Sequence, residues 1–119
     1  MNIVHIVTSS RYKINRKQIR AFVVDMMTKA QVPSEYQVNC IFVGKTKMRQ
    51  ISSKYKKEDV ALPVLSFPYD NDKTSQLNLL GEIFLCYPQI ILLAAERNKR
   101  VEDMILAMVK HGLENLLIR

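Results

Sequence analysis

The C-terminal part of the chain holds a histidine at a position from which a helix could present it to a metal ion. His111 follows Met104 and Met108 by seven and three positions, so its side chain is expected to point with the apolar stripe of a final helix. Asn115 comes four residues later, the spacing at which a helix offers two ligands to one ion, and Glu114 could add an oxygen. Asparagine is a poor zinc ligand, because its side chain is a neutral amide. The spacing alone therefore favours a histidine in the core or at the edge of a cleft over a metal ligand.

Other signs of catalysis are missing from the sequence, which has no Gly-rich phosphate loop, no GxSxG elbow and no CxxC pair. Cys40 and Cys86 lie far apart and are expected to be buried, reduced thiols of a cytoplasmic protein. The 119 residues, 48% of them hydrophobic, are expected to form a single domain spanning residues 1–119. The longest apolar run, residues 90–95, is far shorter than the roughly 20 residues that span a bilayer, and the N-terminus lacks the pattern of a signal peptide. We therefore expect no membrane association.

The charge is unevenly distributed along the chain. The net charge is +7, and residues 1–60 hold 12 Lys or Arg against 4 Asp or Glu. A basic half on a small domain indicates a polyanionic partner, usually a nucleic acid. The alternative is a basic surface that serves only solubility.

Alternation and helical spacing predict four strands and four helices in the order β-α-β-α-β-β-α-α. The expected strands cover residues 2–8, 37–43, 64–67 and 79–86. The first expected helix begins at the cap Asn15 and ends near Ala30, and the second begins at the cap Thr46 and carries an inward-facing Tyr55. The third covers residues 88–98, and the last begins near Arg100. A polar loop is expected at residues 69–76. The first two strands are joined through a helix, which favours a parallel pair, and the last two could be antiparallel. The expected fold class is α+β, with a small mixed four-stranded sheet packed with helices.

Three segments, in the right order, resemble motifs of the YbeY family of rRNA-maturation endoribonucleases. Residues 55–59 followed by 64–68 (YKKED…VLSFP) resemble the family's Y-R-x-K-D…V-L-S-F-P segment. Residues 80–86 (LGEIFLC) are similar to its L-G-D-I-x-I-C strand, and residues 108–113 (MVKHGL) to the start of its H-G-x-L-H-L-x-G-x-D-H motif. The motifs cover roughly residues 35–117, and the order of elements agrees over the rest.

The resemblance implies a metal-dependent enzyme acting on single-stranded RNA in 16S rRNA maturation, in contact with the small ribosomal subunit. The family's metal, usually zinc, is held by three histidines of the last motif, of which the first corresponds to His111. Lys56 takes the place of a cleft arginine that would stabilise charge on the scissile phosphate, and Ser66 would hydrogen-bond in the cleft. His111, Lys56 and Ser66 are therefore the candidate catalytic residues.

The sequence departs from the family pattern where that chemistry resides. The second metal histidine falls on Asn115, the third would lie two residues beyond Arg119, and Lys56 lacks the bidentate fork of arginine. The family's usual C-terminal helix has no counterpart. A zinc hydrolase needs about three protein ligands, so zinc binding and cleavage are expected to be impaired or lost.

Three alternatives remain open at this stage. The chain could be an rRNA-binding ribosome-assembly factor with reduced activity, an active nuclease whose metal site is completed by Glu114, Glu82 or a partner chain, or a non-catalytic interaction subunit. The last would form a homo- or hetero-oligomer through the face that the missing helix leaves uncovered. A chain cut before the motif ends would also explain the missing ligand. Phosphate contacts are expected from Arg16, Lys17, Arg20, Lys47, Arg49, Lys56 and Lys57, with Tyr55, Phe67 and Tyr69 as candidates for base stacking.

Overall fold

The computed structural model describes residues 2–69 and 78–118 of the chain. In these ranges the elements follow the expected order: β1 (Ile3–Val7), α1 (Arg16–Lys29), β2 (Gln37–Val43), α2 (Lys45–Tyr55), β3 (Val64–Pro68), β4 (Leu79–Cys86), α3 (Tyr87–Glu96) and α4 (Val101–Leu117). Most of the polar loop expected at 69–76 lies outside the described residues, since the description stops at residue 69 and resumes at 78.

The four strands form one mixed sheet in the order β1-β2-β4-β3. β1 pairs with β2 and β2 with β4 in parallel, while β3 pairs with β4 antiparallel. The parallel first pair and the antiparallel last pair are both confirmed, and the fold is α+β. A parallel pair needs a long crossover, which α1 supplies between β1 and β2.

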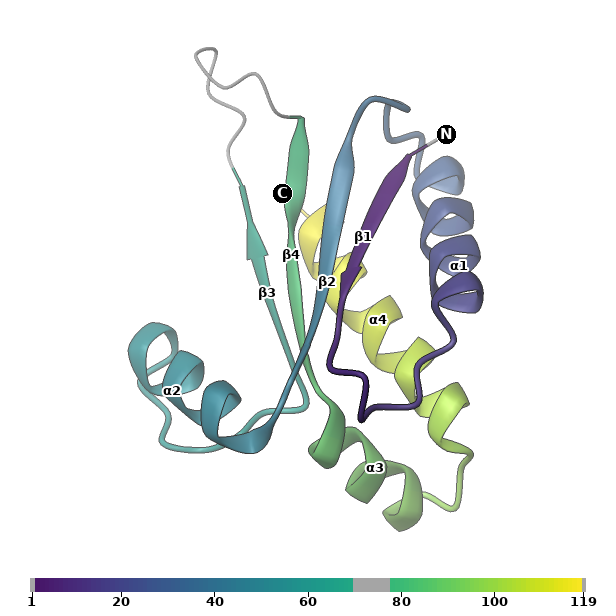
Figure 1. Ribbon diagram of the computed structural model, residues 1–119. Helices are drawn as coiled ribbons and strands as arrows, with labels where there is room; N and C mark the ends of the chain where they lie inside the picture. The colour runs from purple at the N-terminus through teal and green to yellow at the C-terminus, as the bar shows by residue number, and fades with distance from the viewer. Residues whose placement is uncertain (1, 70–77, 119) are drawn as a thin grey trace.

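Helices α1 and α4 cover one face of the sheet, and Figure 1 shows α2 standing apart from them at the β3 end. The main core lies under α1 and α4, where Ile19, Val23 and Met27 of α1 meet the inward residues of the strands. A second, smaller core joins α2 to β3 and β4 through Met48, Ile51 and Leu65. The two faces of the sheet are therefore covered unequally, with the larger core under α1 and α4 and the smaller core under α2.

The cysteines are free and buried, as the sequence predicts. Burial raises the pKa of the Cys40 thiol to about 12 and also raises the pKa of the Cys86 thiol. Both cysteines are therefore inert thiols at neutral pH.

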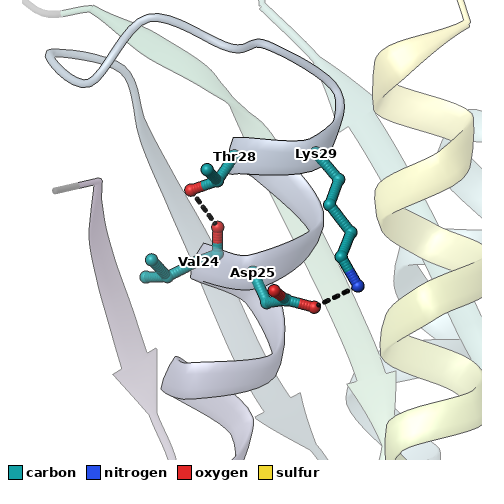
Figure 2. Close-up of polar contacts among 4 residues, drawn as sticks. All are labelled: Val24, Asp25, Thr28 and Lys29. Carbon is teal, nitrogen blue, oxygen red and sulfur yellow. Dashed lines mark hydrogen bonds and ion pairs between the residues drawn. The ribbon is translucent and has the colours of Figure 1, made fainter.

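Helix α1 has the expected cap at its start, since the Asn15 side chain accepts a hydrogen bond from the backbone N–H of Gln18 at 3.0 Å. Two polar contacts join residues near its C-terminal end, as Figure 2 shows: Lys29 pairs with Asp25 at 3.0 Å, and the Thr28 hydroxyl donates to the Val24 carbonyl at 2.8 Å. An exposed pair of this kind, four residues apart, adds only about 0.3–0.5 kcal/mol.

Helix α2 begins earlier in the chain than expected. Gly44 is its N-cap and makes no side-chain hydrogen bond, so Thr46 lies inside the first turn, and the capping role predicted for Thr46 is wrong. The backbone of Gly44 is extended, and its C=O accepts from the N–H of Met48 at 3.0 Å. The first turn thus starts without the side-chain acceptor that a threonine cap would have supplied.

Helix α4 packs unusually close to the sheet at a glycine. A Cβ added to Gly112 would lie 2.6 Å from the Ile83 Cγ2 and 3.2 Å from the Val64 Cγ2. The missing side chain allows the Ser66 hydroxyl to donate to the Gly112 carbonyl at 2.8 Å. The close approach fixes α4 against β3 and β4.

No helix among residues 2–69 and 78–118 is long and apolar enough to cross a membrane.

We predict that Gly112→Ala destabilises the protein. Alanine favours a helix over glycine by about 1 kcal/mol, but overpacking costs about 1–3 kcal/mol at a site that cannot move. The added methyl group meets a β-branched side chain on a central strand, so the free energy of unfolding in urea should fall by about 1 kcal/mol. Lys110→Ala, at an exposed position of the same helix, should leave the unfolding midpoint nearly unchanged. Equal or higher stability of Gly112→Ala would refute the close contact.

Candidate nucleic-acid interface

A groove lies between α2 and the sheet face that α1 and α4 leave free. Its volume is about 630 Å³, within the roughly 300–1,000 Å³ of typical ligand sites. The residues that line it are Lys47, Gln50, Ile51, Lys54, Tyr55, Phe67, Pro68, Tyr69, Glu82 and Phe84. Basic, aromatic and acidic side chains thus share one concave surface.

Strand alternation places the sheet residues of this groove. On β3, Ser66 points to α4, so its neighbour Phe67 points to the opposite face. Phe67 is the direct partner of Glu82 on β4, and directly paired residues share a face. Tyr69 lies two residues beyond Phe67 and returns to the same face.

Aromatic rings form a connected wall along the groove. The rings of Tyr55 and Phe67 meet edge to face with centroids 5.1 Å apart, and those of Phe67 and Phe84 meet in the same way at 5.6 Å. The spacing of Tyr55 in α2 predicts a core residue, and this prediction is wrong: its side chain is 58% exposed. Tyr55 is the last residue of α2 and extends past the small core to the groove wall. The three proposed stacking residues, Tyr55, Phe67 and Tyr69, all line this groove.

The basic residues of the groove come from one stripe of α2. Lys47, Gln50 and Lys54 are separated by three and four positions, so they lie on one face of the helix. The Lys54 ammonium also lies 5.3 Å from the centroid of the Tyr55 ring, within the range of a cation–π contact. The lysines therefore place positive charge along the edge of the aromatic wall.

Glu82 is held at the floor of the groove by two neighbours. The Tyr69 hydroxyl donates to its Oε1 at 2.5 Å, and the Asn39 amide donates to its Oε2 at 3.3 Å. The carboxylate raises the pKa of Tyr69 to about 12, mainly because it accepts the phenolic hydrogen bond, and burial of the phenol adds to the shift. A charged residue in an otherwise apolar strand thus lies in a cleft.

The candidate metal residues do not come together. His111, Glu114 and Asn115 are all exposed on α4, so the prediction that His111 points with the apolar stripe is wrong. The buried stripe of α4 is centred on Ile105, Val109 and Gly112, and His111 lies beyond its edge. Among residues 2–69 and 78–118, no three His, Cys, Asp or Glu side chains are placed to hold one metal ion.

Glu82 cannot complete a site with His111 in this structure. Gly81 and Ile83 pack against Leu116 and Gly112 of α4, so Glu82, between them, points to the other face of the sheet. The described part of the chain therefore does not fit the three-ligand zinc site that the family resemblance implies.

The other two candidate catalytic residues lie apart from the groove lining. Ser66 points to α4 and donates to the Gly112 carbonyl at 2.8 Å, a contact that ties the helix to the sheet. Lys56 is the exposed C-cap of α2, and its backbone N–H bonds the Ser52 carbonyl at 2.8 Å. Lys57 follows with a positive φ of 57° as α2 ends.

The predicted phosphate contacts fall on two separate faces. Arg16 donates to the Ile6 carbonyl at 2.7 Å and Arg20 to the Val4 carbonyl at 3.4 Å, both on the outer edge of β1. These bonds occupy acceptors that an edge strand would otherwise expose. They also explain two arginines in the first turns of α1 without a bound phosphate. Lys47, Arg49, Lys56 and Lys57 instead lie on or next to α2.

Sequence reasoning missed Lys54 and Phe84 in the groove lining, and it missed Asn39, which donates to Glu82. The spacing of Lys54 from Lys47 was a usable signal, because seven residues make about two turns. No sequence signal pointed to Asn39, because its contact with Glu82 depends on the pairing register of β2 with β4, in which the two residues are partners.

Comparison with known proteins assigns the family. A family profile described as "Endoribonuclease YbeY" matches residues 5–117. The chain is 37% identical over 82 residues to the Endoribonuclease YbeY of Finegoldia magna, covering 69% of this chain and 54% of that protein. It is 32% identical over 108 residues to that of Bartonella bacilliformis, covering 89% and 66%. The chain therefore belongs to the YbeY family, and it spans roughly half to two thirds of the length of these relatives.

A solved structure supports the fold. A protein from Thermotoga maritima, known from its solution structure, matches with a TM-score of 0.60 at 19% identity, covering 100% of this chain and 73% of that one. At this identity the likeness concerns the fold alone.

The hydrogen bond between Tyr69 and Glu82 predicts a pH dependence. The folded chain holds the phenolic proton more tightly than the unfolded chain, in which the pKa is 10.0. The hydrogen bond therefore contributes its full stability below about pH 10, and this contribution disappears as pH rises to about 12. The ultraviolet difference titration between the native chain and Tyr69→Phe should show a midpoint near 12. Glu82→Gln should lower that midpoint toward 10.0.

Circular dichroism at each pH identifies the range in which the chain stays folded. A Tyr69 midpoint near 10.0 in that range, unchanged by Glu82→Gln, would contradict the hydrogen bond.

Proposed function

We propose that this chain binds single-stranded RNA in the groove between α2 and the sheet. The observation that carries the proposal is the aromatic wall of Tyr55, Phe67 and Phe84 beside Lys47 and Lys54 in one groove. Surfaces that bind single strands combine aromatic rings, on which bases stack, with positive charge that follows the backbone. Stacking needs unpaired bases, so the groove suits a single strand better than a duplex.

Family membership supports RNA as the ligand, because the relatives are named endoribonucleases. We further propose that the RNA is rRNA of the small ribosomal subunit and that the protein acts in rRNA maturation or ribosome assembly in the cytoplasm. The net charge of +7 supports a polyanionic partner of this kind.

We propose that metal-dependent cleavage by this chain is impaired or lost. Hydrolysis by a bound zinc ion needs about three protein ligands and an open coordination position for water. The described residues place His111 beside an amide at Asn115 and an exposed Glu114, which is a weak set for zinc. The exposed α4 surface around His111 leaves room for a partner chain, which is the alternative route to a complete site.

Binding can be measured by fluorescence anisotropy with a labelled oligouridylate of about nine nucleotides, within the site size of single-strand binding surfaces, at about 50–200 mM salt. The double variant Lys47→Ala/Lys54→Ala should bind more weakly, and its salt slope should be shallower by about 0.7 for each phosphate that it no longer neutralises. Tyr55→Ala should weaken binding by about 1–3 kcal/mol with an unchanged slope, because it removes stacking and no charge.

The matched control is Lys99→Ala/Lys110→Ala, which removes the same charge at exposed positions outside the groove. It should keep the salt slope of the native chain. An equal loss of affinity in both double variants would mean that binding follows net charge alone and would overturn the groove as the site.

The same RNA, incubated with zinc and then with chelator, tests cleavage. We expect the RNA to stay intact with the native chain and with His111→Ala alike. Metal-dependent cleavage that disappears in His111→Ala would show an active site completed by other ligands, and would overturn the proposed loss of activity while leaving the binding proposal intact.

A further inference from the structure

Phosphate binding alone does not explain why the groove contains the negatively charged Glu82. It is half-buried, it lines the groove with Lys47 and Lys54, and its negative charge opposes a polyanion. The aromatic wall lies next to it, since Phe67 is its direct cross-strand partner. A base stacked on this wall would therefore present its edge close to the carboxylate.

The carboxylate is fixed in position by two residues from different parts of the sheet. Tyr69, just after β3, donates to Oε1 at 2.5 Å, and Asn39 on β2 donates to Oε2 at 3.3 Å. An ionised carboxylate has about four acceptor positions on its two oxygens. Each oxygen accepts one hydrogen bond from the described residues, so each retains capacity for one more. The result is a pair of adjacent, oriented acceptors at the floor of the groove.

We propose that the Glu82 carboxylate reads the base edge of the bound RNA and selects guanine. This inference rests on the proposed function, because it concerns RNA bound in the same groove. Glu82 would determine the base specificity of binding, which neither phosphate contacts nor stacking provides, because both are tolerant of sequence.

Guanine matches two adjacent acceptors better than the other bases. Its Watson–Crick edge presents N1–H and an N2 amino hydrogen side by side, so it can donate one hydrogen bond to each carboxylate oxygen. Adenine and cytosine present one amino group beside a ring nitrogen acceptor. Uracil presents one N–H between two carbonyl oxygens, which the carboxylate would repel. A bidentate pair to one base gives about 1–3 kcal/mol of discrimination, and a charged acceptor strengthens each bond.

Aromatic rings around a carboxylate also suit a cationic peptide, but the charges here favour RNA. Lys47 and Lys54 line the same groove, and the chain carries a net charge of +7. Both would repel a cationic segment before it reached Glu82.

Anisotropy tests the inference at fixed salt with the oligouridylate and with the same oligonucleotide carrying one central G, A, C or inosine. The G oligonucleotide should bind about 5- to 150-fold more tightly than the oligouridylate, which corresponds to about 1–3 kcal/mol. Inosine keeps N1–H but lacks the amino group, so its affinity should fall between those of G and U. This comparison uses only the native chain and needs no variant to fold.

Glu82→Gln then tests the residue itself, with Glu58→Gln as its control. Glu58 is exposed just after α2 and outside the groove lining, and the two substitutions change the charge equally. Glu82→Gln replaces one of the paired acceptors with a donor, so the G oligonucleotide and the oligouridylate should bind this variant about equally well. Glu58→Gln should keep the preference of the native chain.

The outcomes separate the two proposals. If the oligouridylate binds but G gives no gain, or if the gain persists in Glu82→Gln, guanine selection by Glu82 is wrong and RNA binding stands. If no oligonucleotide binds, the proposed function fails and this inference fails with it.

Discussion

The antiparallel register of β3 on β4 determines which side chains reach which face of the sheet. Ser66 and Ile83 are register partners and both face α4, while Phe67 and Glu82 are the next pair and face the groove. Side chains alternate along a strand, so a slip by one residue would exchange the two sets. The close packing at Gly112 opposes such a slip, because only a glycine there lets α4 approach Ser66 at hydrogen-bond distance. The groove thus depends on packing on the opposite face of the sheet.

This arrangement separates two features that the family motifs suggest together. His111 lies exposed on α4, whereas the aromatic wall, Lys54 and Glu82 lie on the α2 side. Binding and metal chemistry would therefore use different faces of the sheet in this chain. Within residues 2–69 and 78–118, the α4 face holds no complete set of metal ligands, whereas the opposite face has a formed groove. This separation supports RNA binding that does not require cleavage.

Sequence patterns predicted the fold closely, because they report local preferences. The element order, the parallel pairing of β1 with β2 and the Asn15 cap all follow from spacing and capping chemistry within short windows. The site was predicted less well, because it depends on where elements end relative to their neighbours. Tyr55 fits the inward stripe of α2 but lies past the core, and His111 fits the spacing of Met104 but lies beyond the buried stripe. Asn39 reaches Glu82 only through the β2–β4 register, which no local pattern encodes.

The location of bound RNA is the central claim, and nuclear magnetic resonance of the isotope-labelled chain tests it directly. Amide and aromatic signals would be followed while the unlabelled oligouridylate is added in steps. The account predicts that the largest shift changes fall on residues 47–55, 67–69 and 82–84, around the groove. Changes concentrated on residues 110–115 of α4 instead, with the signals of Tyr55 and Phe67 unmoved, would contradict it.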